Sequence, residues 1–164
     1  MPNKEKGQLR WLWISALMLA VDFSTKLYVL QHLAYNEPLK CLPFLNFTLA
    51  FNRGAAFSFL AYENGWQLWF FSIIAIIIAI VILYWLTKIP RNHNLQAISL
   101  CLILSGAIGN VFDRLNYGYV IDFIDLHYKN YHWPTFNIAD SAICIGAFLF
   151  VISSLFATKK KKLQ

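Results

Sequence analysis

Four long apolar runs constrain what this chain can fold into more than any other feature of its sequence. A bilayer core about 30 Å thick is crossed by roughly 20 apolar residues in an α-helix. The 164-residue chain has runs of this kind at about 11–33, 66–86, 95–112 and 136–156. A chain in lipid must satisfy its backbone hydrogen bonds internally, so we expect a single all-α membrane domain with four transmembrane helices.

Composition and charge agree with a membrane protein. Hydrophobic residues make up 59% of the chain and charged residues 13%, whereas soluble domains carry about 25% charged residues. The net charge is +6, but the basic residues flank the apolar runs instead of following a polar face, so nucleic acid is not an expected partner. The positive-inside rule places both termini and the short 88–94 link in the cytoplasm.

Two longer segments, 34–65 and 115–135, then lie outside. The first contains an alternating stretch at 39–51, punctuated by Pro38 and Pro43, which predicts a short strand or hairpin on the membrane surface. Aromatic rings favour the membrane–water interface. We expect six of them at the outer interface, namely Trp66, Tyr117, Tyr119, Tyr128, Tyr131 and Trp133.

The cysteines do not predict a disulfide framework or a zinc site. Cys41, Cys101 and Cys144 form no CxxC pair, and the last two lie inside apolar runs. Free, buried thiols are therefore the expected state.

Ionisable residues in or beside a membrane span are costly and indicate function by default. Asp22 and Lys26 lie four residues apart in the first run, so they share a helix face and can form a supporting ion pair. Gly106 and Gly109 in the third run favour close helix approach. Asn110 and Asp113 follow on the same side, and the pattern predicts a packed helix that leads into a polar cavity.

Arg114 ends this pattern, and it could instead be an interfacial anchor whose charge reaches the headgroups.

Asp122 and Asp140 are the candidates for chemistry. Apolar neighbours on both sides would hold Asp122 against a low-dielectric surface, and Asp140 lies about one turn into the fourth helix after the N-cap residue Asn137. Two carboxyl groups within hydrogen-bond reach share one proton. Such a pair can direct water at a peptide carbonyl without a metal or an acyl-enzyme, as in aspartic proteases.

Other functions remain open on the residues alone. A small proton-coupled carrier also uses paired carboxylates, but it predicts acids near mid-bilayer and usually an inverted repeat. A metal-dependent phosphotransferase would need an aspartate cluster, and only Asp122 and Asp125 lie three apart. His127 and His132 with Asp125 could bind a metal, although their spacing is not HExxH. Ser141 has no GxSxG context, and no metal or cofactor is expected.

Five motifs cover nearly the whole chain: DFSTK at 22–26, FNRGAAF at 51–57, GAIGNVFDR at 106–114, GYVIDF at 118–123 and FNIADS at 136–141. In this order they resemble the bacterial lipoprotein signal peptidases, also called signal peptidase II. The resemblance implies an aspartyl endopeptidase of the inner membrane, with a small extracytoplasmic β-cradle at about 46–57. Its substrates would be diacylglyceryl-modified prolipoproteins, cut just before the lipid-modified cysteine.

The same resemblance implies roles for individual residues. Asp122 and Asp140 match the catalytic pair. Eight further residues match positions that line or support the site: Asn52, Gly54, Asn110, Arg114 and Asn137 around the dyad, and Asp22, Lys26 and Asp113 beside it. The family also implies contact with membrane lipid, sensitivity to globomycin-type cyclic peptides, an active site at the periplasmic face, and, we expect, a monomer.

Overall fold

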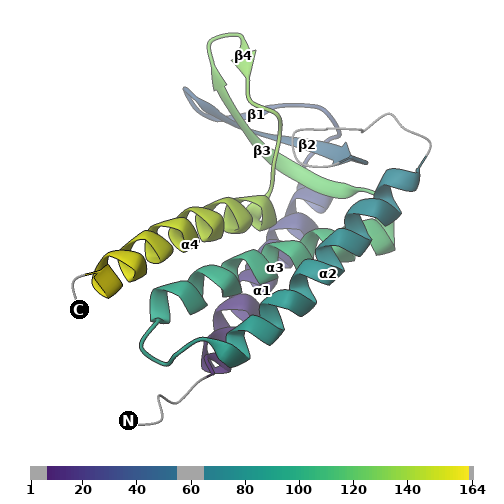
Figure 1. Ribbon diagram of the computed structural model, residues 1–164. Coiled ribbons are helices and arrows are strands. Elements are labelled where there is room, and N and C mark those ends of the chain that lie inside the picture. The colour runs from purple at the N-terminus through teal and green to yellow at the C-terminus, as the bar shows by residue number, and fades with distance from the viewer. Residues whose placement is uncertain (1–6, 55–64, 163–164) are drawn as a thin grey trace.

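The computed structural model of the chain describes residues 7–54 and 65–162. Within these residues, four helices are long and apolar enough to cross a membrane. They lie side by side as a bundle, with a small sheet over one end (Figure 1). The helices are α1 (Leu12–His32), α2 (Trp66–Lys88), α3 (Asn94–Tyr117) and α4 (Ile138–Lys162), and a short 3-10 helix, η1 (Leu9–Trp11), precedes α1.

The helix ends differ from the predicted spans in two places that bear on the site. The third helix was predicted to end near 112, but α3 continues to Tyr117, so Asp113 and Arg114 lie inside it. It ends at Gly118, whose φ of 76° is the left-handed conformation that favours glycine after a helix. The fourth helix begins at Ile138, because Asn137 caps it, and extends to Lys162, beyond the predicted 156.

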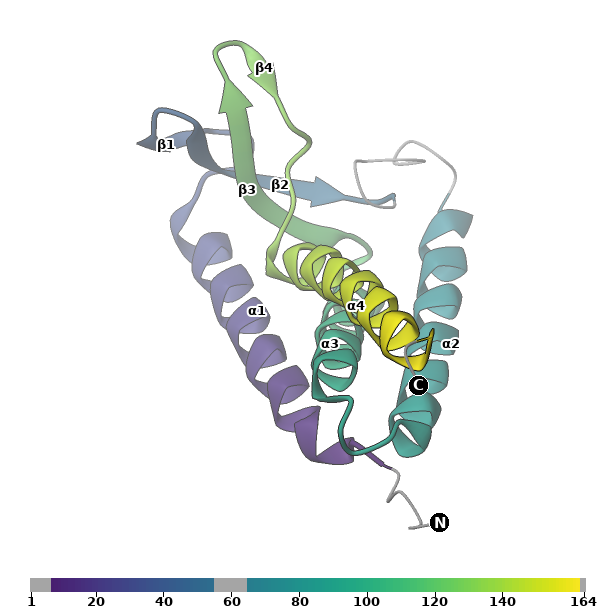
Figure 2. The ribbon, with the colours of Figure 1, turned by 60° about the vertical axis from the view of Figure 1, so that its left-hand side comes forward.

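Helix α3 is the centre of the bundle and packs against each of the other three helices. Figure 2 shows α4 lying across α3, with α1 and α2 on either side. Glycines make the α3–α4 approach possible: a Cβ at Gly106 would overlap the carbonyl oxygen of Ala139, and one at Gly146 would lie 2.7 Å from the oxygen of Ser99. The predicted close approach at Gly106 is therefore confirmed.

The sheet contains four antiparallel strands in the order β1-β2-β3-β4. They are β1 (Leu39–Leu42), β2 (Leu45–Asn52), β3 (Val120–Tyr128) and β4 (Tyr131–His132). The hairpin predicted at 39–51 is β1 and β2. We did not predict β3, because its first four residues are all buried and show no alternation. It pairs with β2 in a register that sets Asp122 opposite Ala50.

A hydrophobic cluster fastens the sheet to the bundle. It joins Val29 of α1 to Leu49 of β2 and to Ile121 and Phe123 of β3, all of them buried. Burying such a side chain stabilises a fold by about 1.5–3 kcal/mol. A second cluster, around Leu86 and the facing residues of α3, holds the opposite end of the bundle. The first cluster therefore fixes the two β3 residues on either side of Asp122, which are Ile121 and Phe123.

The expectation of buried thiols is only partly correct. All three cysteines are free, but Cys41 and Cys144 are exposed and only Cys101 is buried. Cys144 lies in the membrane-spanning part of α4 but is exposed on its surface. A membrane helix also presents apolar residues to lipid, so an apolar run does not imply burial inside the protein.

Candidate active site

Asp122 and Asp140 reach a common site from two different elements. Asp122 is the third residue of β3, and Asp140 lies in the first turn of α4. Phe136 bonds to the backbone of β3, its N–H donating to Ile124 O at 3.1 Å and its C=O accepting from Ile124 N–H at 2.8 Å. This bridge places the start of α4 beside β3.

Both oxygens of Asp122 accept hydrogen bonds from side-chain amides. Asn52, the last residue of β2, donates to Oδ2 at 3.0 Å, and Asn137 donates to Oδ1 at 2.8 Å. Asp122 is 1% exposed, so it depends on these two donors in place of water.

Asn137 also contacts Asp140. The Asn137 Oδ1 atom accepts a hydrogen bond from the Asp140 N–H at 2.8 Å, which makes it the predicted N-cap of α4, and the Asn137 N–H lies 3.4 Å from Asp140 Oδ2. Asn110 of α3 donates to Asp140 Oδ1 at 2.7 Å and accepts from Asn137 Nδ2 at 3.2 Å. Asn137 therefore contacts the Asp122 carboxyl group through its side chain and the Asp140 carboxyl group through its main-chain N–H, and Asn110 connects this network to α3.

The electrostatics of the site favour one retained proton. The pKa of Asp122 is raised to about 8, first by burial and second by the negative charge of Asp140, while the hydrogen bonds from Asn52 and Asn137 oppose the rise. At neutral pH Asp122 is then mostly a neutral acid that can donate a hydrogen bond. Proton sharing of this kind suits an acid–base pair acting on water.

Arg114 and Gly54 close a further side of the site. The Arg114 guanidinium donates to Gly54 O at 3.0 Å and to Asn110 O at 3.4 Å, and it lies 5.8 Å from the ring centre of Phe71. The Gly54 N–H donates to Asn52 Oδ1 at 2.9 Å, which fixes the orientation of that amide. Arg114 thus faces the site and is not a headgroup anchor. Residues 55–57 of the second motif lie outside the described residues.

Asp22, Lys26 and Asp113 form a separate buried ion cluster. Lys26 Nζ lies 2.8 Å from Asp22 Oδ2 and 2.8 Å from Asp113 Oδ2, and all three side chains are about 2% exposed. The predicted pairing of Asp22 with Lys26 is confirmed. The sequence did not indicate that Asp113 would complete the cluster, because it comes from another helix.

This cluster holds the backbone next to each candidate catalytic acid. Asp22 Oδ1 accepts a hydrogen bond from Ala139 N–H at 2.9 Å, and Asp113 Oδ2 accepts one from Ile121 N–H at 3.2 Å. Ala139 precedes Asp140, and Ile121 precedes Asp122. The ion cluster is therefore one residue removed from both carboxyl groups. Sequence reasoning missed these two backbone donors, since a main-chain amide carries no sequence signal.

Asp125 and His132 lie in a third cluster farther along the sheet. The Asp125 carboxylate accepts hydrogen bonds from Asn46 at 3.2 Å and Thr48 at 3.1 Å, and it lies 2.7 Å from His132 Nδ1. Burial raises the pKa of Asp125, but these hydrogen bonds outweigh it and the net shift is downward. Across residues 7–54 and 65–162, no group of three or more His, Cys, Asp or Glu side chains is arranged to hold a metal.

Comparison with known proteins gives one consistent result. Residues 14–156 match the family model described as signal peptidase (SPase) II. A lipoprotein signal peptidase from Alteromonas mediterranea is 51% identical over 97% of this chain and 86% of its own. One from Coxiella burnetii is 46% identical over 97% of this chain and 98% of its own. The carrier alternative finds no support in these relatives.

Solved structures agree in fold. A bacterial membrane enzyme determined by the in meso method at 2.3 Å resolution superposes with a TM-score of 0.86 at 33% identity, covering 98% of this chain and 97% of that one. A second such structure, at 1.9 Å, gives a TM-score of 0.80 at 33% identity, covering 93% and 97%. With its four membrane-spanning helices, its small sheet and this match over most of its length, the chain belongs to the signal peptidase II family.

Proposed function

We propose that this protein is an intramembrane aspartyl endopeptidase that removes signal peptides from diacylglyceryl-modified prolipoproteins, with Asp122 and Asp140 as its catalytic pair. The observation that carries the proposal is the single network in which Asn137 contacts both carboxyl groups. The relatives named above are lipoprotein signal peptidases, which supports prolipoproteins as the substrate class.

The proton positions give each acid a role. At neutral pH Asp122, with a pKa of about 8, carries the shared proton and donates a hydrogen bond to the scissile carbonyl oxygen. Asp140, whose Oδ1 is held by Asn110, takes a proton from the attacking water. The tetrahedral intermediate then collapses: Asp140 gives this proton to the peptide nitrogen, the C–N bond breaks, and the pair returns to its starting protonation state. Neither step needs a metal or a covalent enzyme intermediate.

The position of the site suits a lipid-anchored substrate. Strand β3, which contains Asp122, and the start of α4, which contains Asp140, lie at the end of the bundle that carries the sheet, whereas the start of α1 and the end of α4 lie at the other end (Figures 1 and 2). If the basic ends are cytoplasmic, as the positive-inside rule predicts, the site faces the outer leaflet of the inner membrane. A substrate held there by its acyl chains diffuses in two dimensions, which favours encounter.

The test is a cleavage assay on a diacylglyceryl-modified prolipoprotein in detergent or vesicles. We expect Asp122→Asn and Asp140→Asn each to reduce kcat/KM by about a thousandfold or more, because each removes a proton-transfer group. Asp125→Asn is the matched control on the same strand, and it should retain cleavage. A chelator should not change the wild-type rate.

Substantial cleavage by both active-site variants would end the assignment of the pair. Loss of activity on adding a chelator would instead favour the metal-dependent class. Globomycin-type cyclic peptides should compete with the substrate, and this gives a second, independent readout of the same site.

A further inference from the structure

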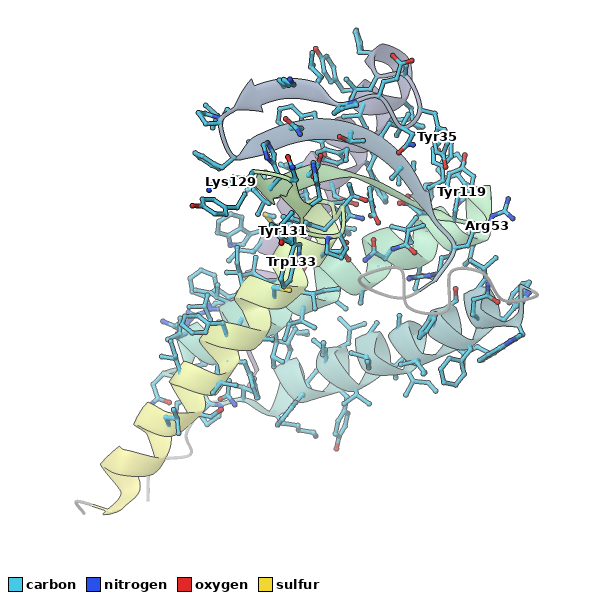
Figure 3. The ribbon with its side chains drawn as sticks, turned by 90° about the horizontal axis from the view of Figure 1, so that it is seen from above. Tyr35, Arg53, Tyr119, Lys129, Tyr131 and Trp133 are labelled. Atoms are coloured by element: carbon cyan, nitrogen blue, oxygen red, sulfur yellow. The ribbon has the colours of Figure 1, made fainter. Side chains whose placement is uncertain are left out.

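An apolar cavity of about 340 Å³ opens directly beside Asp140. One wall comes from the sheet and the segment that follows it, and the other comes from the first two turns of α4. Figure 3 shows Trp133 close to the start of α4. The main lining residues are Leu126, Trp133 and Phe136 on the sheet side, and Asp140, Ile143 and Cys144 on the helix side. The volume lies at the lower end of the range for small-ligand sites, about 300–1,000 Å³.

The sheet-side wall is not built to bind a peptide backbone. Trp133 N–H donates to Leu126 O at 2.8 Å, and Phe136 exchanges both of its backbone hydrogen bonds with Ile124. A peptide laid against this wall would find its main-chain groups unmatched, at a cost of several kcal/mol for each group in a lipid-like medium. On the helix side, Ser141 already donates its hydroxyl to Asn137 O at 2.9 Å. The lining therefore favours hydrocarbon.

An exposed apolar face of α4 follows the cavity's lining residue Cys144. Phe148 lies one helical turn beyond Cys144 on the same face, and its side chain is 66% exposed. Val151 follows at 57% exposure. Both lie in the membrane-spanning part of α4, so this helix face presents apolar side chains to the bilayer up to the cavity.

We propose that this cavity receives an acyl chain of the diacylglyceryl group, and that Cys144 and Trp133 determine which chains fit. The inference rests on the proposed function, in which the lipid-bearing cysteine directly follows the scissile bond. The thioether-linked lipid then starts close to Asp140, and this cavity is an apolar space that borders that carboxyl group. The acyl chain seated here would fix the position of the bond to be cut.

The test fills the cavity and compares two substrates. Cys144→Phe places a ring in the cavity, and Ile145→Phe adds the same ring about 100° around the helix, at a side chain that is 54% exposed. Each variant is assayed with one prolipoprotein carrying either long acyl chains or butyryl chains. We expect Cys144→Phe to raise KM about tenfold for the long-chain substrate and less than about twofold for the short-chain one, with kcat nearly unchanged.

Ile145→Phe should leave both KM values near wild type, because Ile145 does not line the cavity. Equal increases for the two substrates in Cys144→Phe would show that the cavity receives part of the signal peptide, which overturns the proposal. An unchanged KM for the long-chain substrate would overturn it as well. Trp133→Ala removes the opposite wall, and we expect it to reduce the preference for long chains over short ones.

A measurement without turnover separates this proposal from the catalytic one. In a Cys41→Ser, Asp122→Asn protein, Cys144 is the exposed thiol, because Cys101 is buried. We expect the long-chain prolipoprotein to slow maleimide labelling of Cys144 at least about fivefold, and the short-chain form to slow it far less. Equal or absent protection would reject the acyl site even if the catalytic pair is correct. Cleavage by Asp122→Asn would reject the pair even if protection is seen.

Discussion

Two neighbouring clusters of aspartates place the same residue type in different surroundings. Asp22 and Asp113 share one ammonium group, Lys26 Nζ, at 2.8 Å each, so one positive charge lies directly between the two carboxyl groups. Among residues 7–54 and 65–162, the hydrogen-bond donors to the carboxyl groups of Asp122 and Asp140 are neutral amide groups. The first arrangement holds its charges fixed, whereas the second leaves two carboxyl groups competing for a proton.

The comparison teaches that burial alone does not identify a catalytic acid. Asp22, Asp113 and Asp122 are each no more than 2% exposed, and both clusters contact the backbone of β3 and of the segment that begins α4. The partner decides the role: a lysine stabilises carboxylates and favours a fixed structure, while asparagines satisfy a carboxyl group in either protonation state. Five experiments can break or sharpen this contrast.

The largest expected effect on stability comes from removing the lysine. Lys26→Met leaves Asp22 and Asp113 buried without a counter-charge, and we expect the free energy of unfolding to fall by about 3–5 kcal/mol. Thermal unfolding in detergent measures this change. Asp122→Asn is the contrasting variant, since it neutralises a carboxyl group that already retains a proton and should cost little stability.

A triple variant sharpens the same point. Asp22→Asn, Lys26→Met and Asp113→Asn together remove all three charges but keep an acceptor oxygen for each backbone donor. We expect most of the stability lost in Lys26→Met to return, because no uncompensated charge remains. A triple variant as unstable as Lys26→Met would show that the ion cluster contributes more than charge compensation.

Adding a methyl group between α3 and α4 should have the next largest effect. Gly106→Ala would push its new Cβ against Ala139 O and against Ile143 Cγ1, 2.6 Å away, and we expect a loss of about 1–3 kcal/mol. Because Ala139 precedes Asp140, activity should fall more than stability predicts. Gly146→Ala is the matched variant. Gly146 lies on α4 about two turns beyond Ala139, and its new Cβ would lie 2.7 Å from Ser99 O. Equal activity losses in the two would contradict this reasoning.

The pH dependence of cleavage tests the shared proton. Since the pKa of Asp122 is raised to about 8, the group is protonated below that pH and loses its proton above it. We expect kcat/KM to fall about tenfold per pH unit above this value, because the proposed mechanism needs protonated Asp122 to polarise the carbonyl. In Asp125→Asn, the fall of kcat/KM at alkaline pH should begin at the same pH as in the wild type. If kcat/KM began to fall at a pH far from 8, the proton would belong to another group.

The smallest effect is expected at the edge of the sheet. His132 is about half exposed, so His132→Ala should lower the free energy of unfolding by no more than about 1 kcal/mol. The depressed pKa of Asp125 stabilises the fold at neutral pH, and this contribution is lost as pH falls through the folded pKa. Unfolding measured at neutral and acidic pH separates the two contributions. A larger loss in His132→Ala would mean that the hairpin depends on this pair.

Sequence alone determined the elements that depend on local pattern. A run of about 20 apolar residues fixes a membrane helix wherever it occurs in the chain, and the four spans were placed within a few residues. The Asn137 cap, the Asp22–Lys26 pair and the close approach at Gly106 also follow from spacing along one helix. The family motifs then indicated which acids to consider.

Tertiary structure decided the partners. The amide of Asn52 reaches Asp122 across 70 positions in sequence, and Ala139 N–H reaches Asp22 across 117. The addition of Asp113 to the ion cluster, the pairing of β3 with β2, and the exposure of Cys144 beside an apolar cavity depend equally on long-range packing. Local pattern specifies which face of an element is apolar. Which polar groups meet is set only when distant segments close on one another and exclude water, since buried donors and acceptors must then be satisfied by whatever the fold brings within reach.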